Sequence, residues 1–415
     1  IFKLVSKNRI KPLFISSFKK NHREEIGASN KVYRDSICRK HAIESARRYF
    51  ESDEIIKDTE FEEISFKNAL LVWELAVWLL RAYSDAGLVI SHGIYSSYGP
   101  MWRVFADSSR PILVVAPNVG TPGSLLSSYL PHQRMVEEFE LSRQDGVKDE
   151  KKAQDWSRRF LRKRMQLLTA DNKIYYKDLD CRKKFKSKIR QFIEKNGKSI
   201  FYFPNVAWDG NIDERNVLFE SMTASVVASI VMAQRNNVPL VVRFHPSEFS
   251  SIGGSRSLQK EVEEAIEVST VKKSVADRTL FIPSDTDVDI YQFVDSILFG
   301  IVYDSTIGLE LIEFGIPVVG LGRGRAVSSR WCSTPNSVEE FETWFKDPEE
   351  CVLEFRNRLE VSRYQMKNYL YWYHQVASLR MPWLKDQALL EIKSLHCDMN
   401  DHEFRQMVSG KGFAF

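Results

Sequence analysis

The chain lacks several patterns that would place a protein in a well-defined class. Its five cysteines are scattered, odd in number and form no CxxC pair, which argues against zinc or a disulfide framework and favours a reducing, cytoplasmic compartment. No GxxxxGK[ST] motif occurs, and residues 320–324 (GLGRG) do not match the GxGxxG fingerprint, so P-loop and NAD sites are not expected. The formal charge is only +4 and no nucleic-acid-binding motif is found, so we expect no nucleic-acid partner.

Long hydrophobic runs, low-complexity tracts and internal repeats are also missing. The longest apolar run, residues 69–80, is too short to span a bilayer and contains Glu74, so it predicts a core helix. What the sequence does contain is typical of a folded globular protein, with 43% hydrophobic and 12% aromatic residues. A length of 415 residues suffices for two domains, each with its own core.

The second half alternates short apolar runs with segments of helical spacing. Strands are predicted at 200–203, 240–244, 280–283, 297–303 and 316–321, and helices at 214–236 and 258–268. The first half has predicted strands at 10–16, 87–91 and 111–116 and helices at 35–51 and 61–82. Alternation of this kind predicts βαβ units and parallel sheets, hence an α/β fold with two Rossmann-like, doubly wound domains. We expect domains at 1–195 and 196–340, followed by C-terminal helices at 341–415 that pack back across them.

The most informative residues follow two of these predicted strands. His245 stands where the strand at 240–244 ends, and Pro246 can open a helix, whose first N–H groups suit a phosphate. Arg243 could add positive charge there, or could pair with Glu248. Because open α/β sheets bind ligands at the carboxyl ends of their strands, we expect a phosphate-bearing ligand at this edge.

The second group is Ser305, Thr306 and Glu310, after the strand at 297–303. A hydroxyl of Ser305 or Thr306 could bind a phosphate oxygen, and the alternative is simple capping of the next helix. Glu310 lies about one turn further on, where its carboxylate could accept hydrogen bonds from ribose hydroxyls. The alternative for Glu310 is a surface salt bridge.

Three segments, 203–210 (FPNVAWDG), 243–248 (RFHPSE) and 304–317 (DSTIGLELIEFGIP), together carry a family resemblance. They resemble bacterial capsule and surface-polysaccharide glycosyltransferases of the GT-B fold. The His245-Pro246 pair is similar to that of bacterial sialyltransferases and Kdo transferases, which use CMP-linked donors. The resemblance covers residues 199–325 and, in the first half, only residues 91–95 (SHGIY). It implies two Rossmann-like domains that face each other across a cleft, with the donor held mainly by the second.

Two residues are candidates for handling the acceptor proton. Asp209 follows the first strand of the second domain and could act as base, as nucleophile, or in positioning the donor; the alternative is an Asx turn before Gly210. His92 ends a strand of the first domain and could act as a general base, because an imidazole titrates near neutral pH; a turn histidine is equally compatible. The resemblance implies no general need for a metal, so we expect neither metal nor cofactor.

The sequence thus predicts a glycosyltransferase that moves a sugar from a nucleotide-sugar donor to a growing surface glycan or glycolipid. Alternatives are a glycerol-phosphate or polyol-phosphate transferase, a nucleotide-sugar epimerase, and a non-catalytic nucleotide-sugar-binding subunit. The basic segment 151–190 is either a solvated helical face or a contact with anionic membrane lipid. We therefore expect a cytoplasmic protein, with the inner membrane surface as a second location.

Overall fold

The computed structural model describes most of the chain. The described residues are 2–6, 9–13, 28–50, 59–117, 124–131, 134–142, 149–166, 180–206, 218–248, 257–268, 278–286, 288–322 and 324–380. Contacts divide the chain into two compact units, each with its own sheet. Unit 1 comprises Ile1–Ala46, Ile56–Leu141 and Tyr373–Phe415, and unit 2 comprises Arg47–Ile55 and Ser142–Trp372.

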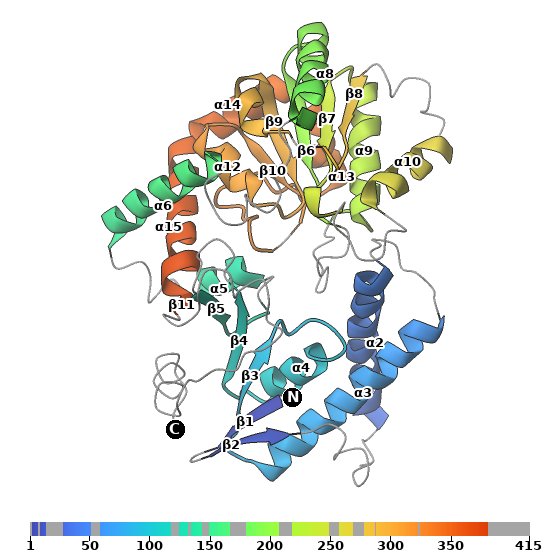
Figure 1. Cartoon of the computed structure of the whole chain (residues 1–415), viewed down its shortest axis with the longest axis vertical. Helices are drawn as coiled ribbons and strands as arrows, with labels where there is room; N and C mark the ends of the chain where they lie inside the picture. The colour runs from blue at the N-terminus through green and yellow to red at the C-terminus, as the bar shows by residue number, and fades with distance from the viewer. Residues whose placement is uncertain are drawn as a thin grey trace. The chain divides into compact units, whose positions relative to one another are not determined.

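The change from unit 1 to unit 2 lies near residue 141, whereas the sequence suggests a boundary near residue 195. The physical reason is helix α6 (Glu150–Met165), which packs against α15 (Leu359–Tyr371) of unit 2. Gln154 donates to the carbonyl of Tyr364 at 3.1 Å, and the Ser157 hydroxyl donates to that of Lys367 at 2.7 Å. The two helices lie side by side in Figure 1.

Unit 2 is built on a sheet of five strands, each parallel to its neighbours (Figure 1). The strands are β6 (Ser199–Phe203), β7 (Leu240–Arg243), β8 (Thr279–Ile282), β9 (Ile297–Val302) and β10 (Val318–Gly320). Their order in space is β8-β7-β6-β9-β10, so the chain starts in the middle, winds to one edge and then returns to wind to the other. This is the doubly wound order, and its direction reverses between β6 and β9. The predicted α/β class and all five predicted strands are confirmed.

The helices of unit 2 follow the same winding. They are α8 (Asp180–Asn196), α9 (Met222–Arg235), α10 (Leu258–Val268), α12 (Ile307–Glu313), α13 (Val338–Lys346) and α14 (Pro348–Asn357), besides α6 and α15. Helix α9 packs against α10, and α12 packs against α6 and α15. The predicted helix at 214–236 begins only at Met222, because the Ser221 hydroxyl accepts the Ala224 N–H and caps it there.

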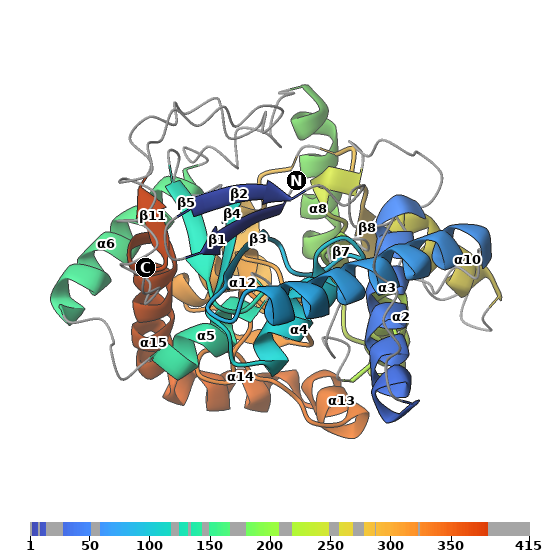
Figure 2. The same cartoon turned by 90° about the horizontal axis from the view of Figure 1, so that it is seen from below.

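Unit 1 has a six-stranded mixed sheet in the order β11-β5-β4-β3-β1-β2. Its strands are β1 (Phe2–Ser6), β2 (Arg9–Leu13), β3 (Gly87–Ser91), β4 (Ile112–Pro117), β5 (Ser124–Ser128) and β11 (Ser378–Arg380). Among these described strands only β3 and β4 pair in parallel, so the doubly wound pattern expected here is limited to one βαβ unit. The connections from β1 to β2 and from β4 to β5 are too short for a crossover, so these strands pair antiparallel (Figure 2).

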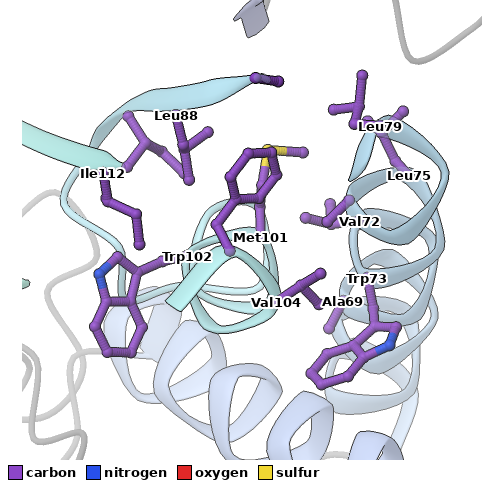
Figure 3. Packing of buried hydrophobic residues seen from close by; sticks show 14 of the residues in the cluster. Ala69, Val72, Trp73, Leu75, Leu79, Leu88, Met101, Trp102, Val104 and Ile112 are labelled. Carbon is purple, nitrogen blue, oxygen red and sulfur yellow. The ribbon is translucent and has the colours of Figure 1, made fainter. Parts of the chain in front are cut away.

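The core of unit 1 lies between its long helices and this sheet (Figure 3). The helices are α2 (Ala28–Phe50), α3 (Thr59–Ala82), α4 (Gly99–Asp107) and the short α5 (Met135–Leu141). Ala69, Val72, Leu75 and Leu79 recur at helical spacing on α3 and point toward Met101 of α4. The apolar run at 69–80 is therefore a core helix, as the sequence predicts.

Candidate functional site

The carboxyl edge of the unit 2 sheet brings together most of the candidate residues. Its centre is the point where the strand order reverses, between the ends of β6 and β9. Two polar residues meet there, because the Asn205 side-chain nitrogen donates to the main-chain oxygen of Asp304 at 3.2 Å. In open α/β sheets, ligands bind in the crevice outside this point.

Asp304 organises the loop that follows β10. Its carboxylate is 1% exposed and accepts the N–H groups of Arg325 at 3.0 Å and Ala326 at 2.9 Å. A Cβ on Gly324 would overlap the Asp304 carboxylate, and one on Gly322 would overlap the main-chain oxygen of Tyr303. Gly322 and Gly324 are therefore required by close packing against the two residues that follow β9.

Arg243, predicted to contact the donor, lies buried at the end of β7. Its guanidinium donates to the carbonyl oxygens of Phe244 at 2.8 Å, Pro283 at 2.6 Å and Thr286 at 2.7 Å. These bonds tie the segment after β7 to the segment after β8. Arg243 thus fixes the shape of this edge, which the sequence pattern did not indicate.

His245 stands partly exposed just beyond β7, as predicted. The helix expected to start at Pro246 is a single 3-10 turn, Pro246–Glu248, closed by the Glu248 N–H donating to the His245 carbonyl at 3.1 Å. So short a turn has no helix macrodipole. The described residues thus show a 3-10 turn in place of the expected helix, and phosphate binding beside Pro246 stays a prediction. His245 keeps its place at the carboxyl edge.

Two acidic side chains are buried together behind this turn. Glu248 is buried beside the first residues of α10, and the nearby Glu261 accepts the Thr223 hydroxyl at 3.0 Å. Burial, with the charge of Glu261 as a second cause, raises the pKa of Glu248 from 4.5 to about 8. Backbone N–H groups of Leu258 and Gln259 and the charge of Arg243 act in the opposite direction. The pairing of Arg243 with Glu248, considered as an alternative, is thus a charge attraction that lowers the pKa of Glu248 only slightly.

The second candidate group surrounds the start of α12. Thr306 occupies the N-cap position, but its hydroxyl makes no capping bond, so the capping alternative is wrong for this residue. That hydroxyl instead accepts a weak hydrogen bond from Arg164 at 3.4 Å. Ser305 is half-buried, and its carbonyl accepts the N–H of Gly308 at 3.1 Å. Both hydroxyls therefore lie at the carboxyl end of β9, as predicted.

Glu310 is not a surface residue. Its carboxylate is 2% exposed, forms an ion pair with Arg164, whose side chain is 13% exposed, and accepts the hydroxyl of Tyr291. The surface salt bridge considered as its alternative is in fact a buried ion pair. Arg164 comes from α6, so this helix contributes to the edge of the sheet. Sequence reasoning placed Arg164 only in a basic segment and had no signal for its partner.

His92 lies in unit 1, at the end of β3, with the backbone in the left-handed region at φ 65°. Gly93 follows at φ 70°. Side chains of α2 and α3 fix the loop. His41 contacts the Ile94 carbonyl, the Ser45 hydroxyl accepts the Ser96 N–H at 2.9 Å, and Asn68 donates to both Ser96 and Ser97. Non-glycine residues keep this strained conformation only where the surroundings enforce it, which is common at functional sites.

The structure thus brings Ser305, Thr306 and Glu310 together and places Arg243 and His245 two strands away, at about 10 Å. His92 belongs to the other unit, and Asp209 lies outside the described residues. Within the described part of the chain no cluster of three or more His, Cys, Asp or Glu side chains is arranged to hold a metal. None of the described helices is long and apolar enough to cross a membrane.

Part of the basic segment 151–190 lies within the described residues, chiefly in α6 and α8. Helix α6 buries one face through Ala153, Ser157, Phe160 and Leu161, and its opposite face exposes cations. The exposed basic residues of α6 are Lys151, Lys152, Arg158, Arg159, Arg162 and Lys163. We call this set the basic face of α6.

Comparison with known proteins gave structural likenesses only, since no family model and no curated protein matches the chain. One similar structure is KpsC of Thermosulfurimonas dismutans, a β-Kdo 2,4 transferase, at 13% identity, 60% coverage of this chain, 75% of that chain and a TM-score of 0.40. Another is UDP-GlcNAc 2-epimerase from Neisseria meningitidis, at 12% identity, 72% and 78% coverage and a TM-score of 0.33. A third is sucrose-phosphate synthase from Thermosynechococcus elongatus, at 11% identity, 84% coverage of this chain, 80% of that chain and a TM-score of 0.33.

A Kdo transferase, a class that the sequence resemblance names, and a nucleotide-sugar epimerase, one of the alternative functions, are thus among the similar structures. The identities and TM-scores are low.

Proposed function

We propose that the protein is a GT-B-type glycosyltransferase that moves a sugar from a nucleotide-sugar donor, CMP-linked as in Kdo transferases, to a bacterial surface glycan. The observation that supports this most is the reversal of strand order between β6 and β9, with polar side chains at the carboxyl ends of β6, β7 and β9. The described residues of the resembling segments that directly follow strands, 204–206, 244–248 and 304–306, lie at the same edge.

In the proposed reaction an acceptor hydroxyl attacks the anomeric carbon of the donor sugar as the bond from that carbon to the nucleotide phosphate breaks. His245, Ser305 and Thr306 stabilise the charge that develops on the departing phosphate. His92 or Asp209 takes the acceptor proton. Glu310 contacts the ribose, since a carboxylate that accepts from Arg164 and Tyr291 still has lone pairs for a further donor. Arg243 acts indirectly by fixing the loops after β7 and β8.

The proposed acceptor is a glycan, and more specifically a glycolipid at a membrane surface. The basic face of α6 would then rest on anionic lipid, because exposed Lys and Arg side chains are attracted to such surfaces. No metal or cofactor enters the proposed reaction, and the proposed location is cytoplasmic, at the inner membrane surface.

The test is thermal stabilisation of the full chain by CMP, CDP, UDP and GDP, with His245→Ala as the comparison. A ligand that binds the folded state at a hundred times its Kd raises stability by about 2.7 kcal/mol. We expect CMP to stabilise the wild type and His245→Ala to lose most of that effect. Stabilisation by none of the four would contradict the proposal.

The competing functions are separated by what the bound donor becomes. A glycosyltransferase releases the nucleotide and extends an acceptor, whereas a glycerol-phosphate transferase leaves a phosphodiester in the product. An epimerase changes the sugar without an acceptor. A non-catalytic subunit binds the donor, turns nothing over and tolerates substitution of His92 and Asp209.

A further inference from the structure

Asn205 lies at the point where the strand order of unit 2 reverses. It follows β6 by two residues, and β6 lies between β7 and β9 in the sheet (Figure 1). Its position in the sheet is therefore between the strand end that precedes His245 and the strand end that precedes Thr306. Only 8% of the residue is exposed. A polar amide in so buried a position needs a full set of hydrogen bonds or a ligand that completes it.

The orientation of the Asn205 amide is fixed by its neighbour. Its nitrogen donates to the main-chain oxygen of Asp304, and a carbonyl oxygen can only accept, so the side-chain oxygen must point the other way. Asp304 is itself held by the N–H groups of Arg325 and Ala326. The direction in which the Asn205 oxygen points is therefore set by two layers of hydrogen bonds.

That oxygen is buried and accepts no hydrogen bond from any of the described residues. Leaving a buried acceptor unsatisfied costs about 1–3 kcal/mol, and an apolar side chain of the same size would avoid the cost. A preoriented, unsatisfied acceptor at the ligand-binding edge of a doubly wound sheet is explained if a substrate supplies the missing donor.

We propose that the Asn205 side-chain oxygen accepts a hydrogen bond from a hydroxyl of the bound donor, either of the ribose or of the transferred sugar. This rests on the proposed function, since it takes the donor to be a nucleotide sugar. Because Asn205 is buried, the low local dielectric strengthens such a bond relative to one made in water. Asn205 thereby becomes a specificity-determining residue that recognises a hydroxyl in addition to the phosphate contacts.

The test compares the wild type with Asn205→Leu, which keeps the approximate size of the side chain and removes both its oxygen and the nitrogen that donates to Asp304. Dissociation constants are measured by titration calorimetry for CMP, UDP and GDP and for CMP-N-acetylneuraminate, UDP-GlcNAc and GDP-mannose. We expect the ligand that binds to lose about tenfold in affinity, as for one uncharged hydrogen bond. Weakening of nucleotide and nucleotide sugar alike assigns the contact to ribose, and weakening of the nucleotide sugar alone assigns it to the transferred sugar.

Tyr369→Phe is the matched control, because the Tyr369 hydroxyl donates to the Arg325 carbonyl and supports the same loop. An equal loss of affinity in Tyr369→Phe would trace the effect to the loop and overturn the proposal. Unchanged affinity in Asn205→Leu would also overturn it while leaving the proposed function intact. A wild type that binds none of the six ligands would refute both. Asn205→Ala replaces Asn205→Leu if the latter does not fold.

Discussion

The buried ion pair between Arg164 and Glu310 gives the sharpest prediction about stability. The perturbation is Arg164→Met, which keeps the length and apolar contacts of the side chain and removes its charge. Glu310 is 2% exposed, so its carboxylate would stay buried with the Tyr291 hydroxyl as its remaining described donor. Removing one partner of a buried pair costs about 3–5 kcal/mol, because the other charge is left uncompensated.

The expected magnitude lies at the lower end of that range, since the Arg164 side chain is 13% exposed and some solvent reaches the pair. About 3 kcal/mol corresponds to a fall in the melting temperature of roughly 6–12 °C for a unit of this size. The matched control is Arg162→Met on the exposed face of the same helix, which we expect to change stability by less than about 0.5 kcal/mol.

The assay is differential scanning calorimetry of both variants, with amide hydrogen exchange on α6 and α12 to assign the transition. Exchange is needed because a chain with two compact units need not unfold in a single step. Adding Glu310→Gln to Arg164→Met should restore at least about 1 kcal/mol, because it removes the stranded charge. Equal melting temperatures for Arg164→Met and Arg162→Met, with no coupling to Glu310→Gln, would refute the reasoning.

Two further predictions concern pH and lipid. The folded-state pKa of Glu248 is raised to about 8, so the folded state binds more protons than the unfolded state between about pH 4.5 and 8. The free energy of unfolding of the protein should therefore fall as the pH rises across that window, by no more than about 5 kcal/mol. Urea titrations at several pH values measure this dependence, and Glu248→Gln should make it less steep. An unchanged pH dependence in Glu248→Gln would contradict the raised pKa of Glu248. For the basic face of α6, the double variant Arg158→Ser, Arg162→Ser should bind vesicles of anionic phospholipid about thirtyfold more weakly than the wild type, because each lost cation contributes about 1 kcal/mol. Vesicles of neutral lipid are the control. Equal binding by variant and wild type would exclude this face.

Short-range pattern was sufficient for the strands of unit 2, but not for all of its helices. The short apolar runs of β6, β7 and β9 predict buried parallel strands, and the observed strand ends lie within two residues of the prediction. The same pattern could not distinguish parallel from antiparallel pairing in unit 1, because there the connection lengths decide it.

The sequence by itself determined that His245, Ser305 and Thr306 follow strands of an α/β sheet, because strand and turn propensities act over a few residues. Only the tertiary structure decided the partners of the buried polar groups. Arg164 and Glu310 are 146 positions apart, and Asn205 and Asp304 are 99 apart. Arg243 donates to the carbonyl oxygens of Pro283 and Thr286, 40 and 43 positions along the chain, and its contact with the donor stays a prediction. A buried charge or amide takes whichever partner packing brings within hydrogen-bonding distance, and local sequence carries no record of that partner.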